Sequence, residues 1–253
     1  ARARKEAEGT DPLDTYDDVC ASLKPVMHHF FHERWPAAAE WFEHRLLYAR
    51  SLATSSMVGF LVGLGDRHSS NILIDTRTAE LVHIDLGIAF EQGSLLRTPE
   101  IVPFRLTRDL EDALGVTGVD GPMRGAAEHT MRVLRAHAEA LLATLQVIVY
   151  NPLYKWALDH KRAIKVERRG DEAFAGGSAT VLGGGDNAAD ADADDTRNLE
   201  AERALARVYL KLEGRVAGCS ERLGVEGQVR HLIVEARDPG RLARMFEGWA
   251  AWL

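Results

Sequence analysis

The chain has only two cysteines, Cys20 and Cys219, among its 253 residues. Two cysteines so far apart in sequence provide neither the closely spaced ligands of a metal clip nor the several pairs of a disulfide framework. The sequence also lacks an apolar run near the roughly 20 residues that a transmembrane helix needs, and its N-terminal residues are charged. We therefore expect an intracellular protein of a reducing compartment, without a secretion signal or a membrane span.

Acidic residues also outnumber basic ones. The chain has 31 Lys and Arg against 38 Asp and Glu, a formal net charge of −7. Between residues 170 and 200 eight acidic residues face one arginine, so this stretch alone accounts for the whole excess. An acidic stretch repels phosphate backbones, and the remaining charge is balanced. We expect no direct nucleic-acid site in this chain.

Apolar periodicity and turn residues predict a mainly helical fold with one small β-hairpin. Hydrophobic residues make up 46% of the chain, which is enough for a substantial core. The hairpin is expected to pair residues 71–74 with residues 81–84 across a polar turn, followed by a long ordered loop. The expected helices cover residues 13–35 with an interruption at Pro25, the stretch from after Pro36 to the glycines at 63 and 65, residues 126–150, residues 199–212, and two helices after residue 224, the second of which starts at Asp238-Pro239.

Residues 170–197 differ in composition from the rest of the chain. They are rich in Gly, Ala and Asp and contain almost no large apolar side chains. Such a segment cannot bury enough apolar surface to offset the entropy of ordering it. The sequence therefore predicts an acidic, disordered linker here.

Two short motifs carry most of the chemical information. The stretch GLGDRHSSN at 63–71 places Asp66, His68 and Asn71 in one turn, and HIDLG at 83–87 places Asp85 after the second predicted strand. Phosphoryl transfer needs a carboxylate to orient the attacking hydroxyl and oxygen ligands to hold Mg²⁺ against the phosphates. Asp66 and Asn71 are five residues apart, as are the base aspartate and the metal-binding asparagine of protein kinases, and Asp85 precedes Leu-Gly as the metal-binding aspartate of kinases precedes Phe-Gly. The hairpin should bring both motifs to one end of the sheet, as a phosphoryl-transfer site.

The order Asp-Arg-His differs from the His-Arg-Asp of ordinary protein kinases and resembles the phosphatidylinositol 3-kinase-related kinases, whose catalytic loop reads GDRHxxN and whose activation segment begins with HIDxG. The resemblance covers roughly residues 14–160 and 200–253. It is carried by WFEHRLLYARSLATSSMVGFLVGLGDRHSSNILID, AELVHIDLGIAFEQG and TPEIVPFRLTRDL, and by a tail, GQVRHLIVEARDPGRLARMFEGWAAWL, that is similar to the FATC domain of these kinases.

This resemblance implies a domain organisation. Residues 1–160 would form the C-lobe of a PI3K/PI4K-like kinase fold with the catalytic loop and activation segment. Residues 161–220 would be a variable regulatory region that holds the acidic linker, and residues 221–253 a helical FATC domain. The sequence contains no glycine-rich phosphate loop and no strand with a phosphate-pairing lysine. We therefore expect the chain to begin inside the C-lobe of a much larger protein and to transfer little phosphate alone.

The resemblance also implies residue roles and a function. Asp66 and His68 would be catalytic, His68 by stabilising charge near the transferred phosphoryl group, whereas Asn71 and Asp85 would bind Mg²⁺ or Mn²⁺ and, through it, ATP. The implied activity is phosphorylation of Ser or Thr followed by Gln on protein substrates. The implied setting is the nucleus, in the DNA damage response, DNA repair, telomere maintenance and cell-cycle control, as a homodimer assembled through a more N-terminal region and recruited by a DNA-end-binding complex.

Three other functions fit the residues less well. A phosphoinositide lipid kinase needs a cationic activation segment, whereas residues 88–107 contain two arginines and two glutamates. A catalytically dead kinase-like scaffold would lack at least one of Asp66, Asn71 and Asp85, and all are present. A metal-dependent phosphohydrolase generally needs more histidine and carboxylate ligands.

His28 and His32 are four residues apart and would share one helix face, as zinc ligands can. No further ligand set is evident in the sequence, so we expect a structural or solvated role for them.

Overall fold

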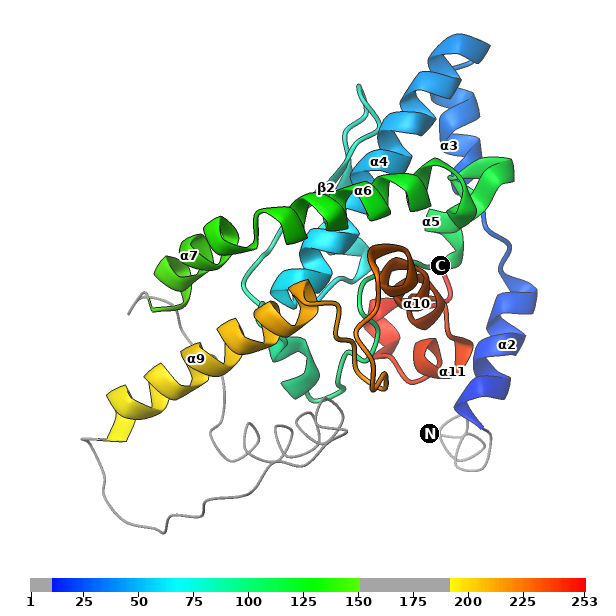
Figure 1. The fold of residues 1–253 in the computed structure, drawn as a ribbon. Helices are drawn as coiled ribbons and strands as arrows, with labels where there is room; N and C mark the ends of the chain where they lie inside the picture. Colours follow the sequence, from blue (N-terminus) through cyan, green and yellow to red (C-terminus); the bar gives the residue numbers. More distant parts are fainter. Residues whose placement is uncertain (1–10, 151–191) are drawn as a thin grey trace.

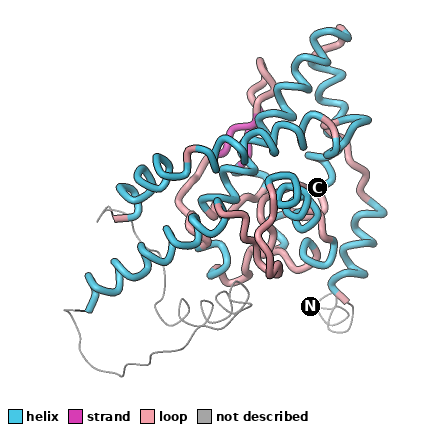
Figure 2. Tube along the Cα trace, in the orientation of Figure 1, coloured by secondary structure: helices cyan, strands magenta, loops and turns pink. Residues whose placement is uncertain are grey.

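The computed structural model describes residues 11–150 and 192–253. This part of the chain is mainly helical and contains one two-stranded sheet, which confirms the expected fold class (Figures 1 and 2). The α-helices and strands are α2 (Pro12–Ser22), α3 (Met27–Arg34), α4 (Ala38–Val62), β1 (Ile72–Ile74), β2 (Leu81–His83), α5 (Arg108–Asp112), α6 (Pro122–Ala136), α7 (Ala138–Val149), α9 (Asp192–Leu212), α10 (Val225–Ala236) and α11 (Pro239–Leu242). Short 3-10 helices lie at Ser69–Asn71, Gln92–Leu95, Gly115–Asp120 and Glu247–Trp249.

Helix α4 is the central element and ends where the sequence predicts. Its C-terminal half is buried on most sides, which fits its nearly continuous apolar sequence. Gly63 stops the helix in the left-handed conformation, with φ 61°, and its N–H donates to the carbonyl of Phe60 at 3.2 Å. The next N–H, of Leu64, donates to the carbonyl of Gly59 at 2.8 Å, which completes the usual glycine-based helix end. The chain therefore turns sharply from α4 into the GDRH motif.

Gly63→Ala is expected to destabilise the fold, whereas Gly125→Ala is expected to stabilise it. An added Cβ at Gly63 would lie 2.4 Å from the backbone nitrogen of Glu91, and the left-handed conformation adds a cost of about 1–2 kcal/mol. Gly125 lies within α6, no atom is within 4 Å of its added Cβ, and alanine there should contribute about 0.5–1 kcal/mol. Urea denaturation of both variants measures the difference, and equal shifts of the same sign would contradict this account of Gly63.

The predicted hairpin is present. β1 and β2 pair antiparallel with Ile72 opposite His83 and Ile74 opposite Leu81. The N–H of Ile84 donates to the carbonyl of Asn71 at 3.1 Å, which extends the pairing to the residue before Asp85. The GDRH turn and Asp85 thus lie at the same end of the sheet, as the sequence predicts.

The prediction of one helix over residues 126–150 is wrong in its start and its continuity. α6 begins earlier, at Pro122. The helix is interrupted at His137, which has the non-helical φ −111° and ψ 28°, before α7 starts. The two halves pack into different clusters: Met131 of α6 lies in the main core with α4 and α10, whereas Leu145 of α7 packs against α9. One straight helix could not direct a single apolar face toward both clusters. Figure 1 shows the change of direction between α6 and α7.

The acidic linker expected at residues 170–197 lies mostly outside the described residues. Its last part, residues 192–197, belongs to α9, so the linker prediction is wrong there. α9 buries the side chains of Ala201, Ala204 and Val208 against α7.

The C-terminal residues are built into the fold. α10 buries Val229, Leu232, Ile233 and Ala236 in the main core. Asp238 accepts the N–H of Arg241 at 2.7 Å and Pro239 follows it, so the expected helix start is confirmed. Residues 239–253, which we call the C-terminal segment, pack against α2 in a separate cluster that contains Tyr16 and Trp249. Within residues 11–150 and 192–253, no helix has the length and apolarity needed to cross a bilayer.

Candidate functional site: a phosphoryl-transfer site

Three of the predicted residues meet in residues 65–71, which we call the catalytic loop. The Asn71 Nδ2 donates to the carbonyl of Asp66 at 2.9 Å and lies 3.4 Å from its Oδ2. The His68 Nε2 lies 3.9 Å from the other carboxylate oxygen, Oδ1. The His68 Nδ1 accepts the N–H of Ser70 at 3.2 Å, which fixes the ring at the start of a 3-10 turn. A carboxylate, an imidazole and an amide thus surround one point after α4.

Arg67 connects this loop to the fourth predicted residue. Its side chain is buried, and its guanidinium donates to the carbonyls of Gly65 and Ile84, both at 2.8 Å, and to that of Asp85. Burial lowers the pKa of Arg67, while Asp66, Glu100 and Asp85 favour its charged form. The Arg67 guanidinium therefore links the backbone of the catalytic loop to the backbone at Asp85. Sequence reasoning missed this role, because nothing in a lone arginine of a turn signals its burial.

Both predicted carboxylates have strained backbones. Asp66 has φ 60° and Asp85 has φ 53°, in the left-handed region that non-glycine residues rarely adopt. Such strain persists only where surrounding contacts enforce it, and it concentrates at functional sites. Two strained aspartates at one end of a small sheet favour a catalytic site over a pair of ordinary turn residues.

The donor set fits a magnesium ion that is shared with phosphates. Mg²⁺ is usually held by one or two carboxylates, water and substrate phosphates rather than by an all-protein cage. Asp85 offers a carboxylate, and the amide oxygen of Asn71 is the second ligand type, because the amide nitrogen already donates to Asp66. Among residues 11–150 and 192–253, no group of three His, Cys, Asp or Glu could hold a metal by itself.

The two histidines of the possible zinc motif have structural contacts instead. His28 Nδ1 lies 2.6 Å from Asp112 Oδ2, and the His28 backbone N–H donates to the same oxygen at 2.9 Å. His32 stacks on Trp41, with ring centroids 5.5 Å apart. These contacts fix α3 against α5 and α4, as expected for a structural role.

The outward face of the hairpin is apolar and open beside the site. Leu73 and Val82, opposite each other in the ladder, are 47% and 45% exposed, and Ile84 is 40% exposed. His83, which points to the other face, is partly buried, and its pKa falls to about 4 through burial and the charge of Arg67. Sequence reasoning did not assign these apolar residues, although their period-two alternation distinguishes them from the inward set. They form an apolar platform next to Asn71 and Asp85.

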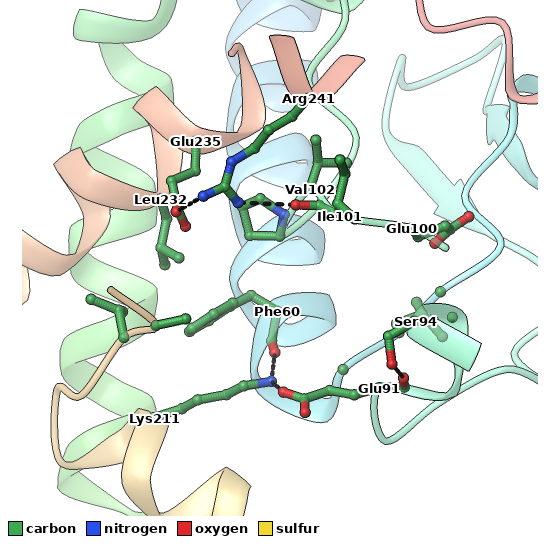
Figure 3. Close-up of a pocket in the computed structure, with 17 residues that line it drawn as sticks. Phe60, Glu91, Ser94, Glu100, Ile101, Val102, Lys211, Leu232, Glu235 and Arg241 are labelled. Carbon is green, nitrogen blue, oxygen red and sulfur yellow. Dashed lines mark hydrogen bonds and ion pairs between the residues drawn. The ribbon is translucent and has the colours of Figure 1, made fainter. Parts of the chain in front are cut away.

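A cleft of about 430 Å³ lies on another side of the catalytic loop, between the end of α4, the segment of residues 85–107 and the C-terminal helices (Figure 3). We call residues 85–107 the activation segment. The cleft is lined by Phe60, Gly63, Leu64, Gly65, Glu91, Gly93, Ser94, Glu100, Ile101, Val102, Pro103, Lys211, Val216, Ala217, Leu232, Glu235 and Arg241. Gly65 precedes Asp66, so the cleft leads directly to the catalytic loop.

The charges of this cleft are largely paired. Glu91 accepts from the buried Lys211 at 2.7 Å and pairs with Arg207 at 3.1 Å. Burial acts to raise the pKa of Glu91, but the two cations together lower it. Arg241 pairs with Glu235 and donates to the carbonyl of Ile101 at 3.0 Å, as Figure 3 shows. Sequence reasoning missed Lys211 and Arg241, because their partners are far away in the chain.

The chain is similar to known protein families along most of its length. The family model "Phosphatidylinositol 3- and 4-kinase" matches residues 4–158, and the model "FATC domain" matches residues 222–253. The chain is 47% identical over 243 residues to the Serine/threonine-protein kinase ATM of Arabidopsis thaliana, covering 96% of this chain and 6% of that protein. It is 44% identical over 250 residues to the Serine-protein kinase ATM of Sus scrofa, covering 96% of this chain and 8% of that protein.

A solved structure supports the same relation. The "Tel1 kinase butterfly symmetric dimer" superposes with a TM-score of 0.76 at 37% sequence identity, covering 99% of this chain and 10% of that one. The chain therefore spans less than a tenth of the length of the two curated relatives given above. What is shared is the fold and sequence of this region.

Proposed function

Because the chain belongs to the phosphatidylinositol 3- and 4-kinase family, we propose that it provides the catalytic C-lobe of an ATP-dependent serine/threonine protein kinase of the ATM type. The observation that carries the proposal is the convergence of Asp66, His68 and Asn71 in one loop that Arg67 ties to Asp85. The named relatives that match nearly all of this chain are serine/threonine or serine protein kinases.

Asp66 is suited to orient a substrate hydroxyl and to accept its proton. The hydroxyl oxygen would form a bond to the γ-phosphorus of ATP, the bond from that phosphorus to the bridging oxygen of ADP would break, and the proton would go to the Asp66 carboxylate. Asn71 and Asp85 would hold the metal, which when bound neutralises charge on the phosphates. His68, 3.9 Å from the Asp66 carboxylate, would stabilise charge near the transferred group.

The apolar platform of Leu73, Val82 and Ile84 is suited to the adenine ring. A flat aromatic base needs an exposed apolar surface within reach of the groups that hold its phosphates. The platform has that exposure and adjoins Asn71 and Asp85. ATP bound in this way would lie across the end of the hairpin, with its phosphates above the catalytic loop.

The cleft favours a protein substrate over a phosphoinositide. It contains Glu91, Glu100 and Glu235, and its two cations, Lys211 and Arg241, are already engaged with glutamates. An inositol phosphate headgroup needs several free cations. The mostly apolar lining and the paired charges fit an uncharged peptide side chain. The paired charges of the cleft therefore support a protein kinase over a lipid kinase.

The family resemblance supports a finer proposal. The substrates would be Ser or Thr followed by Gln in proteins of the DNA damage response, DNA repair, telomere maintenance and cell-cycle control. The protein would act in the nucleus, as a homodimer recruited by a DNA-end-binding complex. The metal would be Mg²⁺ or Mn²⁺.

The substrate proposal is tested with the complete protein that contains this chain. We expect it to phosphorylate a Ser-Gln peptide at least about tenfold better, by kcat/KM, than a matched Ser-Ala peptide, which corresponds to about 1.4 kcal/mol. Phosphatidylinositol vesicles should receive no phosphate. Preferential transfer to the lipid would establish the lipid-kinase alternative, and absence of transfer to all three would favour the scaffold.

A further inference from the structure

The strained backbone of Asp66 requires support from outside the catalytic loop. A left-handed aspartate costs of order 1 kcal/mol or more unless neighbouring groups stabilise that conformation. The side chain of Asn71 binds the carbonyl side of Asp66, at 2.9 Å. The backbone N–H of Asp66 is bound by Glu100 of the activation segment, a residue that the sequence did not predict as part of the site.

Glu100 binds the backbone at the catalytic aspartate directly. Its Oε2 accepts the N–H of Asp66 at 2.8 Å, and the backbone N–H of Arg67 also favours the charged carboxylate. The Glu100 carboxylate packs closely against Gly65 and Gly93, because a Cβ added at either glycine would lie 3.2 Å from this Oε2. The two glycines therefore leave the space that the carboxylate occupies.

The C-terminal segment braces Glu100 in turn. Arg241 donates to the carbonyl of the next residue, Ile101, at 3.0 Å. The indole Nε1 of Trp249 is buried without a hydrogen-bond partner of normal geometry among the described residues, and the indole favours the charged form of Glu100. Arg105 lies over the Trp249 ring, 4.4 Å from its centroid, and donates to the carbonyls of Trp249 and Ala250. A chain of contacts thus runs from the C-terminal segment to Asp66.

We propose that Glu100 is a positioning residue that holds the Asp66 backbone in its catalytic conformation and couples it to the C-terminal segment. The proposal rests on the proposed kinase activity of Asp66. It adds a role for Glu100 that acts through the Asp66 N–H rather than on the substrate. It also gives a physical reason why the C-terminal segment and the catalytic loop should respond to the same mutations.

The primary test is Glu100→Gln in the complete protein, measured with the Ser-Gln peptide. Glutamine keeps the size and one acceptor oxygen but removes the charge. We expect kcat to fall about 10-fold to 100-fold, the equivalent of one hydrogen bond to a charged group, with little change in the KM for ATP. Glu111→Gln is the matched control: Glu111 also contacts the C-terminal region, through a bidentate pair with Arg237 at 2.7 and 2.8 Å, but not the catalytic loop. Its kcat should remain at the wild-type value.

The pH profile of kcat gives a readout that a purely structural residue would not change. Burial raises the pKa of Glu100, and the protonated acid is a weaker acceptor, so wild-type kcat should fall as pH drops through this pKa. Glu100→Gln should lose that component of the acidic limb. Trp249→Phe removes the N–H that favours the carboxylate, so the limb should move to higher pH.

Hydrogen exchange of the Asp66 and Arg67 amides tests the contact without reference to activity. Both amides should exchange at least about tenfold faster in Glu100→Gln and in Glu100→Ala than in the wild type or Glu111→Gln. If the wild-type protein transfers no phosphate, the proposed function fails, and the exchange rates still decide whether Glu100 holds the loop. The proposal would be overturned if Glu100→Gln kept the kcat, the pH profile and the amide exchange rates of the wild type.

Discussion

Replacing Asp66 with asparagine is expected to lower kcat for peptide phosphorylation by a factor of about 10² to 10⁴. Asparagine has nearly the same shape as aspartate but cannot accept the substrate proton. It also tolerates the left-handed backbone that Asp66 adopts at φ 60°, so the loop should keep its conformation. The expected signature is a large loss of kcat with an unchanged melting temperature and unchanged ATP binding.

Asp120→Asn is the matched control for this substitution. Asp120 is an exposed residue at the end of the 3-10 helix Gly115–Asp120, and it pairs with Arg124 of α6 at 3.0 Å, away from the catalytic loop. An exposed pair of this type contributes little to stability, so both kcat and melting temperature should stay near wild type. If Asp66→Asn retained more than about a tenth of wild-type kcat, Asp66 would not be the proton acceptor.

Trp249→Ala is expected to lower the free energy of unfolding by about 3–5 kcal/mol. Trp249 is only 3% exposed and packs in the cluster of Tyr16, Leu242 and Met245, under the guanidinium of Arg105. Truncation would leave a cavity and would remove the ring beneath a buried cation. Urea denaturation of the 253-residue chain, followed by helical circular dichroism, measures this loss.

Phe246→Ala provides the comparison for Trp249. Phe246 belongs to the same C-terminal segment and is also aromatic, but its side chain is 61% exposed. Its removal should change the free energy of unfolding by less than about 1 kcal/mol. Equal effects of the two substitutions would contradict the attribution of the stability loss to the burial of Trp249.

The sequence reveals the candidate catalytic residues because their signals are local. Asp66, Asn71 and Asp85 belong to motifs with fixed spacing, and the hairpin between them is encoded by two short apolar runs and a polar turn. The start of the last helix at Asp238 is equally local, because a capping residue followed by proline defines it. Features determined within a few residues could therefore be predicted.

Contacts between distant segments could not be predicted in the same way. Glu100 is 34 residues from Asp66, and Lys211 is 151 residues from Phe60, whose carbonyl it binds at 2.7 Å. No periodicity identifies such partners, since they depend on how the helices pack. The break at His137 was missed for a related reason: the apolar repeat continues across it, and only the two separate clusters explain it. Tertiary packing overrode the local pattern there.

Binding of Mn²⁺ with a nonhydrolysable ATP analogue to the complete protein, measured by electron paramagnetic resonance, tests the proposed metal site at Asp85. We expect nucleotide-dependent Mn²⁺ binding by the wild type, by Asp66→Asn and by Asp120→Asn. Asp85→Asn should lose more than about tenfold in Mn²⁺ affinity, because a metal ligand is removed. Unchanged Mn²⁺ affinity in Asp85→Asn would contradict the assignment of this end of the hairpin as the site of phosphoryl transfer.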